Sequence, residues 1–236
     1  MKGLLIVGAG GFARETAQVA RAANGPDAVL GHLDDDPARQ GTEVDGLPVL
    51  GGSELVHAYP EAPVVVCVGN PRDWAGRARL VRRLGLPEQR YGTVVHPSAS
   101  VAESAEIGPG SVLLAQCALT ASVRVGAHVA VMPQVVLTHD DVVGDFATLT
   151  SGVRLGGGVR VGEGAYVGAG ALVREGVSVG AWSQLGMGAL LLEDLPPGEV
   201  WIGSPARKLR SVPDGALNEL QLARGAGNCA TGHPPT

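Results

Sequence analysis

The residues best suited to acid–base chemistry lie around His139, which two aspartates, Asp140 and Asp141, follow directly. Histidine titrates near neutral pH, so an imidazole can take a proton from an amine or a hydroxyl that attacks another group. Of the six histidines, only His128 and His139 lie well inside the repetitive segment described below. The pattern therefore indicates a general base at His139, although a solvated histidine at a surface corner would also fit it.

A glycine-rich segment near the N-terminus is a second candidate site. Gly8, Gly10 and Ala13 follow the apolar run Leu4–Val7 and open a helical pattern, so backbone amides and a helix dipole can hold a pyrophosphate there. Asp34 lies about 20 residues further on, where an acidic residue can contact a ribose. NAD fits this pattern too, but the unit is about half a dinucleotide fold, so a single nucleotide such as a UDP-sugar fits better. The alternatives are a docking domain without ligand and a solvated strand end at Asp34.

The elements that would position this loop alternate between strands and helices. Apolar runs predict strands at Leu4–Val7, Val29–Leu33, Pro48–Leu50 and Val64–Val68. Helical spacing predicts helices over residues 11–23 and 72–84, and Ser53 is expected to cap a further helix. The solvated face of the second helix is expected to carry Arg77, Arg79, Arg82 and Arg83. Residues 1–92 are therefore predicted to form a small Rossmann-like α/β domain.

A different pattern fills the rest of the chain. An aliphatic residue recurs every six positions, 17 consecutive times from Val95 to Leu191, and a mostly small residue follows each of them four positions later. A period of six is typical of a β-solenoid in which three hexads close a triangular coil with the aliphatic residues inside. Glycine commonly follows the aliphatic residue and is expected to serve the corner backbone. A parallel β-helix is predicted over residues 93–212, then a flexible tail over 213–236 with a short helix at Ala216–Ala223.

Asp141 departs from this repeat, because it occupies the small inward column. An unpaired carboxylate inside a prism would cost several kcal/mol, so Asp141 must be paired, protonated or turned outward. We hypothesise that it shares with Asp140 the work of orienting the His139 imidazole. The alternative is a local distortion of the corner.

Composition excludes several classes of function. The net charge of −5 and the lack of a basic block argue against a nucleic-acid partner, and no stretch reaches the ~18 apolar residues of a membrane span. Cys67, Cys117 and Cys229 lie too far apart for a disulfide framework, which fits a reducing cytoplasm. No metal is expected, because His96, His128 and His139 take different places in their hexads. The chain is therefore expected to be soluble and cytoplasmic.

The hexads, with the closing segment Gly203–Arg207, resemble the left-handed β-helix acyltransferases. A narrower resemblance, over residues 1–210, rests on Gly8–Phe12, Asp34–Asp36, Gly69-Asn70 and Leu137–Asp140. In that combination the chain is similar to the sugar acetyltransferases, which include sialic acid O-acetyltransferases and N-acetyltransferases of UDP-linked 4-amino sugars. The fold expected is a small Rossmann-like βαβ domain followed by a left-handed parallel β-helix.

The resemblance implies roles for individual residues. It implies that His139 is the catalytic base and that Asp140 raises its basicity. Nucleotide-sugar binding is implied for Gly10, Gly11, Phe12, Asp34, Asp35, Gly69 and Asn70. Contacts with acetyl-CoA, in a groove between subunits of a homotrimer, are implied for Thr148, Gly157, Ala169 and Met187. Three residues depart from the family pattern: Phe12 and Thr148 stand where histidine is typical, and Met132 stands where asparagine is common.

The function expected is transfer of acetyl from acetyl-CoA, a cosubstrate, to the amino group of a nucleotide-linked sugar of the UDP-4-amino type. Direct attack is expected, since no cysteine lies near His139 in this register. The alternatives are O-acetylation of sialic acid or another sugar hydroxyl, and a trimeric scaffold without catalysis, for which the three departures argue. Arg207 and Lys208 are candidates to pair with CoA phosphates, or are surface charges.

Overall fold

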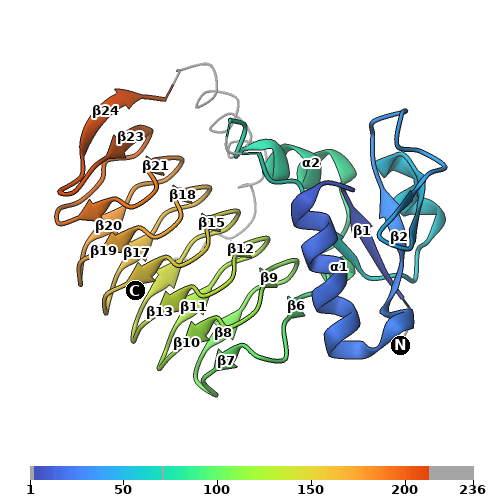
Figure 1. The fold of residues 1–236 in the computed structure, drawn as a ribbon, viewed down its shortest axis with the longest axis horizontal. Coiled ribbons are helices and arrows are strands. Elements are labelled where there is room, and N and C mark those ends of the chain that lie inside the picture. The colour runs from blue at the N-terminus through green and yellow to red at the C-terminus, as the bar shows by residue number, and fades with distance from the viewer. Residues whose placement is uncertain (1–2, 71, 213–236) are drawn as a thin grey trace, which may run out of the picture.

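The computed structural model describes residues 3–70 and 72–212, which form two unlike units in succession (Figure 1). The first is a small Rossmann-like α/β unit and the second is a left-handed parallel β-helix, as the sequence predicts. The predicted domain limits stay predictions. The predicted tail, its helix at Ala216–Ala223 and Cys229 lie outside the described residues.

The N-terminal sheet has the strand order β3-β4-β2-β1-β5. Its strands are β1 (Leu4–Val7), β2 (Val29–Leu33), β3 (Glu43–Val44), β4 (Leu47–Gly51) and β5 (Val64–Val66). Because β1 pairs in parallel with β2 and β5 and is buried on both faces, it is a continuous apolar run. The sequence did not indicate β3, which forms a hairpin with β4 through Asp45 and Gly46 at positive φ.

Two α-helices cover this sheet, α1 (Gly11–Asn24) and α2 (Gly76–Leu84), with 3-10 helices at Pro26–Ala28, Ser53–Ala58 and Glu88–Arg90. The helix predicted from residue 72 begins at Gly76, because the amides of Asp73 and Gly76 close turns before it. The prediction that Ser53 is an N-cap was wrong. Gly52 holds that position, and the Ser53 hydroxyl accepts a hydrogen bond from Arg83 at 3.0 Å.

The prediction that Arg77 lies on the solvated face of α2 was wrong, because Arg77 is buried. Its Nη2 donates to the carbonyl oxygens of Phe146 (2.8 Å) and Ala147 (3.1 Å) and to Oγ1 of Thr148 (2.8 Å). Burial lowers the pKa of Arg77 to about 10. Because a buried cation needs such acceptors, these bonds explain why the guanidinium lies against the β-helix instead of in water.

Seventeen two-residue strands follow the predicted period of six. They are β6 (Val94–Val95), β7 (Ser100–Val101), β8 (Glu106–Ile107), β9 (Val112–Leu113), β10 (Ala118–Leu119), β11 (Arg124–Val125), β12 (Ala130–Val131), β13 (Val136–Leu137), β14 (Val142–Val143), β15 (Thr148–Leu149), β16 (Arg154–Leu155), β17 (Arg160–Val161), β18 (Tyr166–Val167), β19 (Leu172–Val173), β20 (Ser178–Val179), β21 (Gln184–Leu185) and β22 (Leu190–Leu191). From β6 to β19, each strand pairs in parallel with the strand three further along, so the coils present three sheets. An antiparallel pair, β23 (Glu199–Ile202) and β24 (Arg207–Ser211), closes the end.

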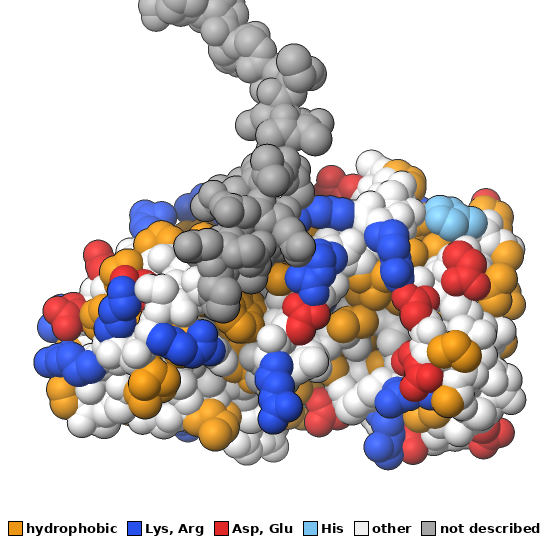
Figure 2. All heavy atoms as spheres, turned by 90° about the horizontal axis from the view of Figure 1, so that it is seen from above, with side chains coloured by type: hydrophobic (Ala, Val, Ile, Leu, Met, Phe, Trp, Pro, Cys, Tyr) orange, Lys and Arg blue, Asp and Glu red, His pale blue; other side chains and the backbone are white. Residues whose placement is uncertain are grey.

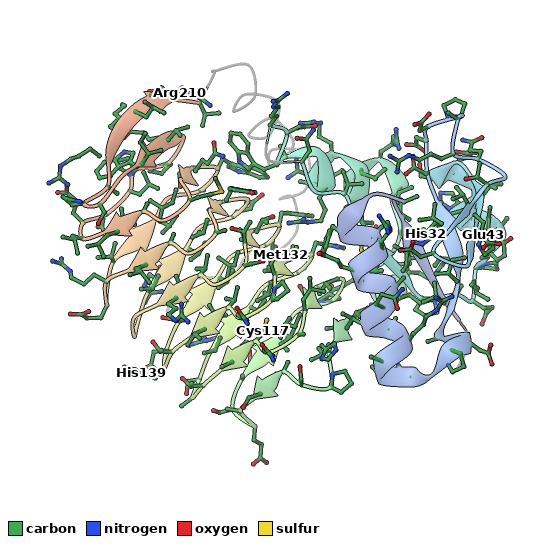
Figure 3. All side chains as sticks on the ribbon, in the orientation of Figure 1. His32, Glu43, Cys117, Met132, His139 and Arg210 are labelled. Atoms are coloured by element: carbon green, nitrogen blue, oxygen red, sulfur yellow. The ribbon has the colours of Figure 1, made fainter. Side chains whose placement is uncertain are left out.

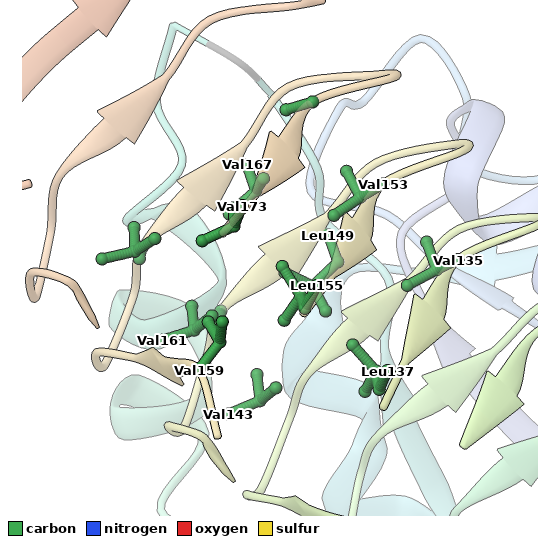
Figure 4. Close-up of a cluster of buried hydrophobic side chains, with 14 of the residues drawn as sticks. Val135, Leu137, Val143, Leu149, Val153, Leu155, Val159, Val161, Val167 and Val173 are labelled. Carbon is green, nitrogen blue, oxygen red and sulfur yellow. The ribbon is translucent and has the colours of Figure 1, made fainter. Parts of the chain in front are cut away.

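The aliphatic column fills the prism, as Figure 4 shows for Leu137, Leu149 and Leu155. The glycines that follow this column do not serve the corner backbone as expected. They lie against the next coil, and a Cβ on Gly108 would overlap the backbone of Gly126. Left-handed backbone occurs two positions later, for example at Gly152 (φ 73°).

Among the described residues, no helix is long and apolar enough to cross a membrane. On the face shown in Figure 2, outside the grey atoms, basic and acidic side chains are interspersed. Near the closing pair, Arg207 lies 3.2 Å from Glu193 and Lys208 lies 2.5 Å from Glu199. Both candidate partners of CoA phosphates therefore have carboxylate neighbours, and their role in CoA binding stays a prediction.

Candidate active site

His139 and Asp140 form an exposed pair in the turn between β13 and β14. The distance between His139 Nδ1 and Asp140 Oδ2 is 2.9 Å, and each side chain is 69% exposed. Figure 3 shows His139 at the edge of the β-helix that lies away from the N-terminal unit. We call residues 138–141 and 156–159, the turns of two successive coils, the exposed corner.

Gly157, in the next coil, lies against the His139 ring. A Cβ at this position would overlap Cε1 and Nε2 of the imidazole, so any other residue would displace the ring. The amide of Gly158 donates to the His139 carbonyl at 2.9 Å, which ties the two turns together. Because Gly157 has no side chain, the imidazole of His139 can occupy this space.

Asp141 is fully buried beside this pair and is hydrogen-bonded to backbone amides. Its Oδ2 accepts from Thr138 N and its Oδ1 accepts from Val159 N, both at 2.8 Å. Burial raises the pKa of Asp141 to about 6, against the two amide bonds, which lower it. Neither bond is to the imidazole, so Asp141 does not touch the ring through these contacts, and the hypothesis that it helps to orient His139 stays a prediction.

The glycine-rich loop lines a groove of about 300 Å³ at the start of α1. Gly10, Gly11 and Phe12 lie there with Gly69 and Asp34. Asp34 is held in place because its Oδ2 accepts a hydrogen bond from the amide of Ala9 at 2.8 Å. Arg39 also lines the groove and lies 3.6 Å from the Asp34 carboxylate. These residues bring backbone amides, one carboxylate and one cation to a helix N-terminus.

Asp35, the other predicted aspartate, lies apart from this groove. Its carboxylate accepts hydrogen bonds from Ser53 N (2.8 Å) and from Arg83, and it lines a separate polar pocket with Glu54 and His57. These hydrogen bonds lower the pKa of Asp35 against the opposing effect of its burial. Asp34 and Asp35 therefore lie in two different pockets although they are adjacent in sequence.

An adjoining pocket of about 200 Å³ lies between the N-terminal unit and the sheet that contains β12, β15 and β18. The three residues that depart from the family pattern, Phe12, Met132 and Thr148, all line it. The other lining residues are Val68, Gly69, Asn70, Trp74, Arg77, Ala130, Thr150 and Tyr166. The hexad register could have indicated Tyr166, which lies one coil after Thr148. No sequence signal indicated that Arg77 would be buried here.

The pocket and His139 lie on different sides of the β-helix. The pocket opens on the face of β12 and β15, whereas His139 lies in the turn after β13. Figure 3 shows Met132 beside the N-terminal unit and His139 at the far edge. One chain therefore does not bring its own imidazole to its own pocket.

The four residues that the resemblance assigns to acetyl-CoA also lie apart within one chain. Thr148 lines the pocket and Gly157 contacts His139. Ala169 and Met187 stack one coil apart at a third place, where the Gly188 amide donates to the Ala169 carbonyl at 2.8 Å. Met187 is 81% exposed, an unusual exposure for a methionine.

His128 occupies a different environment from His139. It is 6% exposed, stacks on Phe146 at 5.1 Å between ring centroids and meets the edge of Tyr91 at 4.4 Å. Burial lowers the pKa of His128 to about 4. Trp182, two coils beyond Phe146, packs against Ala78 of α2. We call residues 126–129, 144–147 and 180–183 the covered corner.

The described cysteines are poorly placed to act as nucleophiles. Cys67 and Cys117 are buried, and burial raises the pKa of Cys67 to about 12. A thiol with such a pKa is not ionised near neutral pH, and the Cys67 thiol donates to Thr16 Oγ1 at 3.3 Å. Within residues 3–70 and 72–212, no group of three histidine, cysteine or acidic side chains is placed to hold a metal.

The chain is similar to proteins with known activities. The family described as the PglD N-terminal domain matches residues 3–84. UDP-N-acetylbacillosamine N-acetyltransferase of Bacillus subtilis (strain 168) is 34% identical over 118 residues, which are 49% of this chain and 52% of that protein. The match therefore spans about half the length of that curated relative.

Solved structures resemble the chain over a larger part of its length. A variant of perosamine N-acetyltransferase from Caulobacter crescentus, in complex with CoA and GDP-perosamine, is 30% identical with a TM-score of 0.79, covering 88% of this chain and 97% of that one. The acetyltransferase domain of PglB from Neisseria gonorrhoeae FA1090, in complex with acetyl coenzyme A, is 30% identical with a TM-score of 0.78, covering 88% and 99%.

Proposed function

Because the chain belongs to the sugar acetyltransferase family of the left-handed β-helix superfamily, we propose that it transfers acetyl from acetyl-CoA to the amino group of a nucleotide-linked amino sugar. The observation that carries this proposal is the exposed His139–Asp140 pair above Gly157. Similarity to enzymes that act on UDP- and GDP-linked amino sugars supports the acceptor class.

His139 acts as the general base. Its Nδ1–H donates to Asp140 Oδ2 at 2.9 Å, which leaves the lone pair of Nε2 to take a proton. The sugar amine attacks the thioester carbonyl, its nitrogen forms the new C–N bond, and the proton passes to Nε2. The C–S bond then breaks, and the CoA thiolate leaves and takes up a proton. No enzyme nucleophile is needed, in keeping with the raised pKa of Cys67.

The glycine-rich groove holds the nucleotide end of the acceptor. The amides at the start of α1 can bind the pyrophosphate, and Asp34 is held beside the loop by the amide of Ala9. Gly10 and Gly11 leave open space there, since a Cβ on either would meet no atom within 4 Å. Uridine is our first expectation for the base. Asp35 lines a separate pocket, so we do not place it among the groups that hold the pyrophosphate.

The complete site lies between two copies of the chain in a homotrimer. Each copy supplies a groove and pocket on one side and an exposed imidazole on the other, which is the arrangement that a cyclic oligomer brings together. Acetyl-CoA lies in this cleft against Gly157, and Thr148, Ala169 and Met187 are its further proposed contacts. The exposure of Met187 fits a residue that a neighbouring molecule covers.

The experiment is a measurement of CoA release from acetyl-CoA with UDP-, dTDP- and GDP-linked 4-amino sugars. We expect release that depends on one of these acceptors, together with a raised melting temperature when that acceptor is added. If no amine or hydroxyl acceptor releases CoA, the proposal fails. The non-catalytic scaffold, which the apolar residues Phe12 and Met132 in the pocket favour, would then replace it.

A further inference from the structure

Two turns of the β-helix begin with the same residue and differ in the three residues that follow. Residues 150–153 and 138–141 each follow a strand and each start with threonine. In both turns the threonine hydroxyl donates to a carbonyl of the next coil, Thr150 at 2.7 Å and Thr138 at 3.1 Å. In the first turn the Thr150 amide donates to that same carbonyl at 3.0 Å and continues the ladder between coils.

The Thr138 amide leaves the ladder. It donates to Asp141 Oδ2, and β13 pairs with β16 at a single residue pair, Val136 with Arg154. Every other pair of neighbouring strands from β6 to β22 has two such residue pairs. Between residues 94 and 191, the ladder is therefore shortened only at the turn that carries His139.

The second oxygen of Asp141 holds the neighbouring turn. Oδ1 accepts from Val159 N, and Val159 lies two residues after Gly157, the residue against the imidazole. The Val159 amide is a buried donor that needs an acceptor and the Thr138 amide is partly buried; the carboxylate supplies one oxygen to each. Asp141 thus fixes the backbone on either side of the space that the imidazole occupies.

We propose that Asp141 is a positioning residue for His139, acting through the backbone amides of Thr138 and Val159 and not through contact with the ring. By drawing the Thr138 amide inward, it sets the turn so that the imidazole lies over Gly157. The inference rests on the proposed function, in which His139 is the base.

The protonation state of Asp141 bears on this arrangement. The charged groups that bear on the Asp141 carboxylate are His139 and Asp140, and burial raises its pKa to about 6. The ionised carboxylate accepts from both amides, whereas a protonated one loses acceptor capacity on the oxygen that carries the proton. The hold on the turn is therefore expected to weaken as the pH falls below about 6.

The chain itself offers a matched control at Ser111, which occupies the same inward column. Its Oγ accepts from Val129 N at 2.9 Å, as Asp141 does from Val159 N, and donates to the Gly126 carbonyl at 2.8 Å. The amide three positions before Ser111, that of Gly108, stays on the ladder at 2.7 Å. Serine at this place therefore links two coils and leaves the ladder intact at the start of its own turn, residues 108–111.

The test compares Asp141→Ser and Ser111→Ala with the unmodified full-length protein. In Asp141→Ser we expect kcat to fall about 10- to 100-fold, because small displacements of a reacting group have effects of that order. KM for both substrates should change less than threefold, and melting should stay cooperative. The acid limb of the kcat–pH profile should also lose the ionisation near pH 6. Ser111→Ala should keep kcat within twofold.

A second readout separates this inference from the proposed function. The ring-nitrogen signals of His139 in NMR spectra report its tautomer and environment, and we expect them to shift in Asp141→Ser but not in Ser111→Ala. Unchanged His139 signals, or kcat within twofold of the unmodified protein, would overturn the positioning role. If the unmodified protein releases no CoA with any acceptor, the proposed function fails and the NMR comparison alone decides the role of Asp141.

Discussion

The exposed corner and the covered corner are built from the same hexad repeat and differ in what surrounds them. His139 is 69% exposed and lies beside a carboxylate, whereas His128 is 6% exposed and lies between two aromatic rings. The difference comes from what covers each corner: α2 packs on the covered corner, whereas the exposed corner leaves the His139 ring open to solvent. Exposure and neighbours, more than residue type, decide which histidine can do chemistry.

The largest expected effect separates the two histidines by activity. His139→Ala should lower kcat about 10³-fold, within the range measured for loss of a general base. The melting temperature should stay close to that of the unmodified protein, because the removed side chain is exposed. Steady-state CoA release and circular dichroism melts check both parts. A variant that retains more than a tenth of the activity would remove His139 from the mechanism.

A second prediction concerns the stability of the covered corner. Arg77→Met should lower the free energy of unfolding by about 3 kcal/mol, because the carbonyls of Phe146 and Ala147 lose a buried donor. Arg79, which pairs with Asp73 at the surface, is the matched control, and Arg79→Met should cost less than about 1 kcal/mol. Urea titrations of both variants measure the difference. Equal effects would contradict a clamp at the covered corner.

Gly157→Ala should disturb the exposed corner without touching the core. The new Cβ would overlap the imidazole, so His139 must move, and kcat should fall about 100-fold. Gly157 is not at positive φ, so the backbone itself tolerates alanine. Kinetics paired with a crystal structure of the variant provides the measurement. An unmoved His139 ring, or unchanged kcat, would count against the site geometry.

The covered histidine should affect stability through pH. The pKa of His128 is lowered to about 4, so its neutral form contributes stability above the ordinary pKa of 6.5 that is lost as the pH falls toward 4. The loss is up to about 3 kcal/mol. His128→Phe should fold, because Phe146 and Trp182 share its left-handed backbone in the same column (φ 55°, 59° and 57°).

Urea titrations between pH 4 and 7 compare this variant with the unmodified protein. The pH dependence of the free energy of unfolding that His128 causes should be absent in His128→Phe. Asp141 acts in the opposite direction: its raised pKa contributes stability below its ordinary value of 3.8, which is lost as the pH rises through about 6. Both proteins contain Asp141, so its contribution cancels when the free energy of unfolding of one is subtracted from that of the other. Parallel curves would show that His128 is not buried in the neutral form.

The sequence predicted the β-helix almost completely, because each coil repeats one local rule. Val95 to Leu191 keep the period of six, and every one of these residues lies in a strand. Prediction failed where a contact between distant segments decides the outcome. Arg77 looked like a surface residue because nothing near it in sequence shows that the carbonyls of Phe146 and Ala147 will meet it.

The candidate site shows the same limit. Hexad register brings Gly157 one coil from His139, so that neighbourhood could be predicted, and Asp141 could be recognised as out of place. Its two amide partners could not, since they depend on a shortened ladder. That Phe12, Met132 and Thr148 line one pocket also needed the structure, because the N-terminal unit and the β-helix meet there.

Mixing of subunits tests most directly the claim that two copies share the site. His139→Ala removes the base, and Gly11→Glu places a carboxylate in the first turn of α1, where it favours the helix but repels a pyrophosphate. Each variant alone should be nearly inactive. After unfolding and refolding together in equal amounts, about one quarter of the sites in random trimers would combine an intact groove with an intact imidazole, and activity should rise accordingly. A mixture no more active than its two components would contradict a site built between copies of the chain.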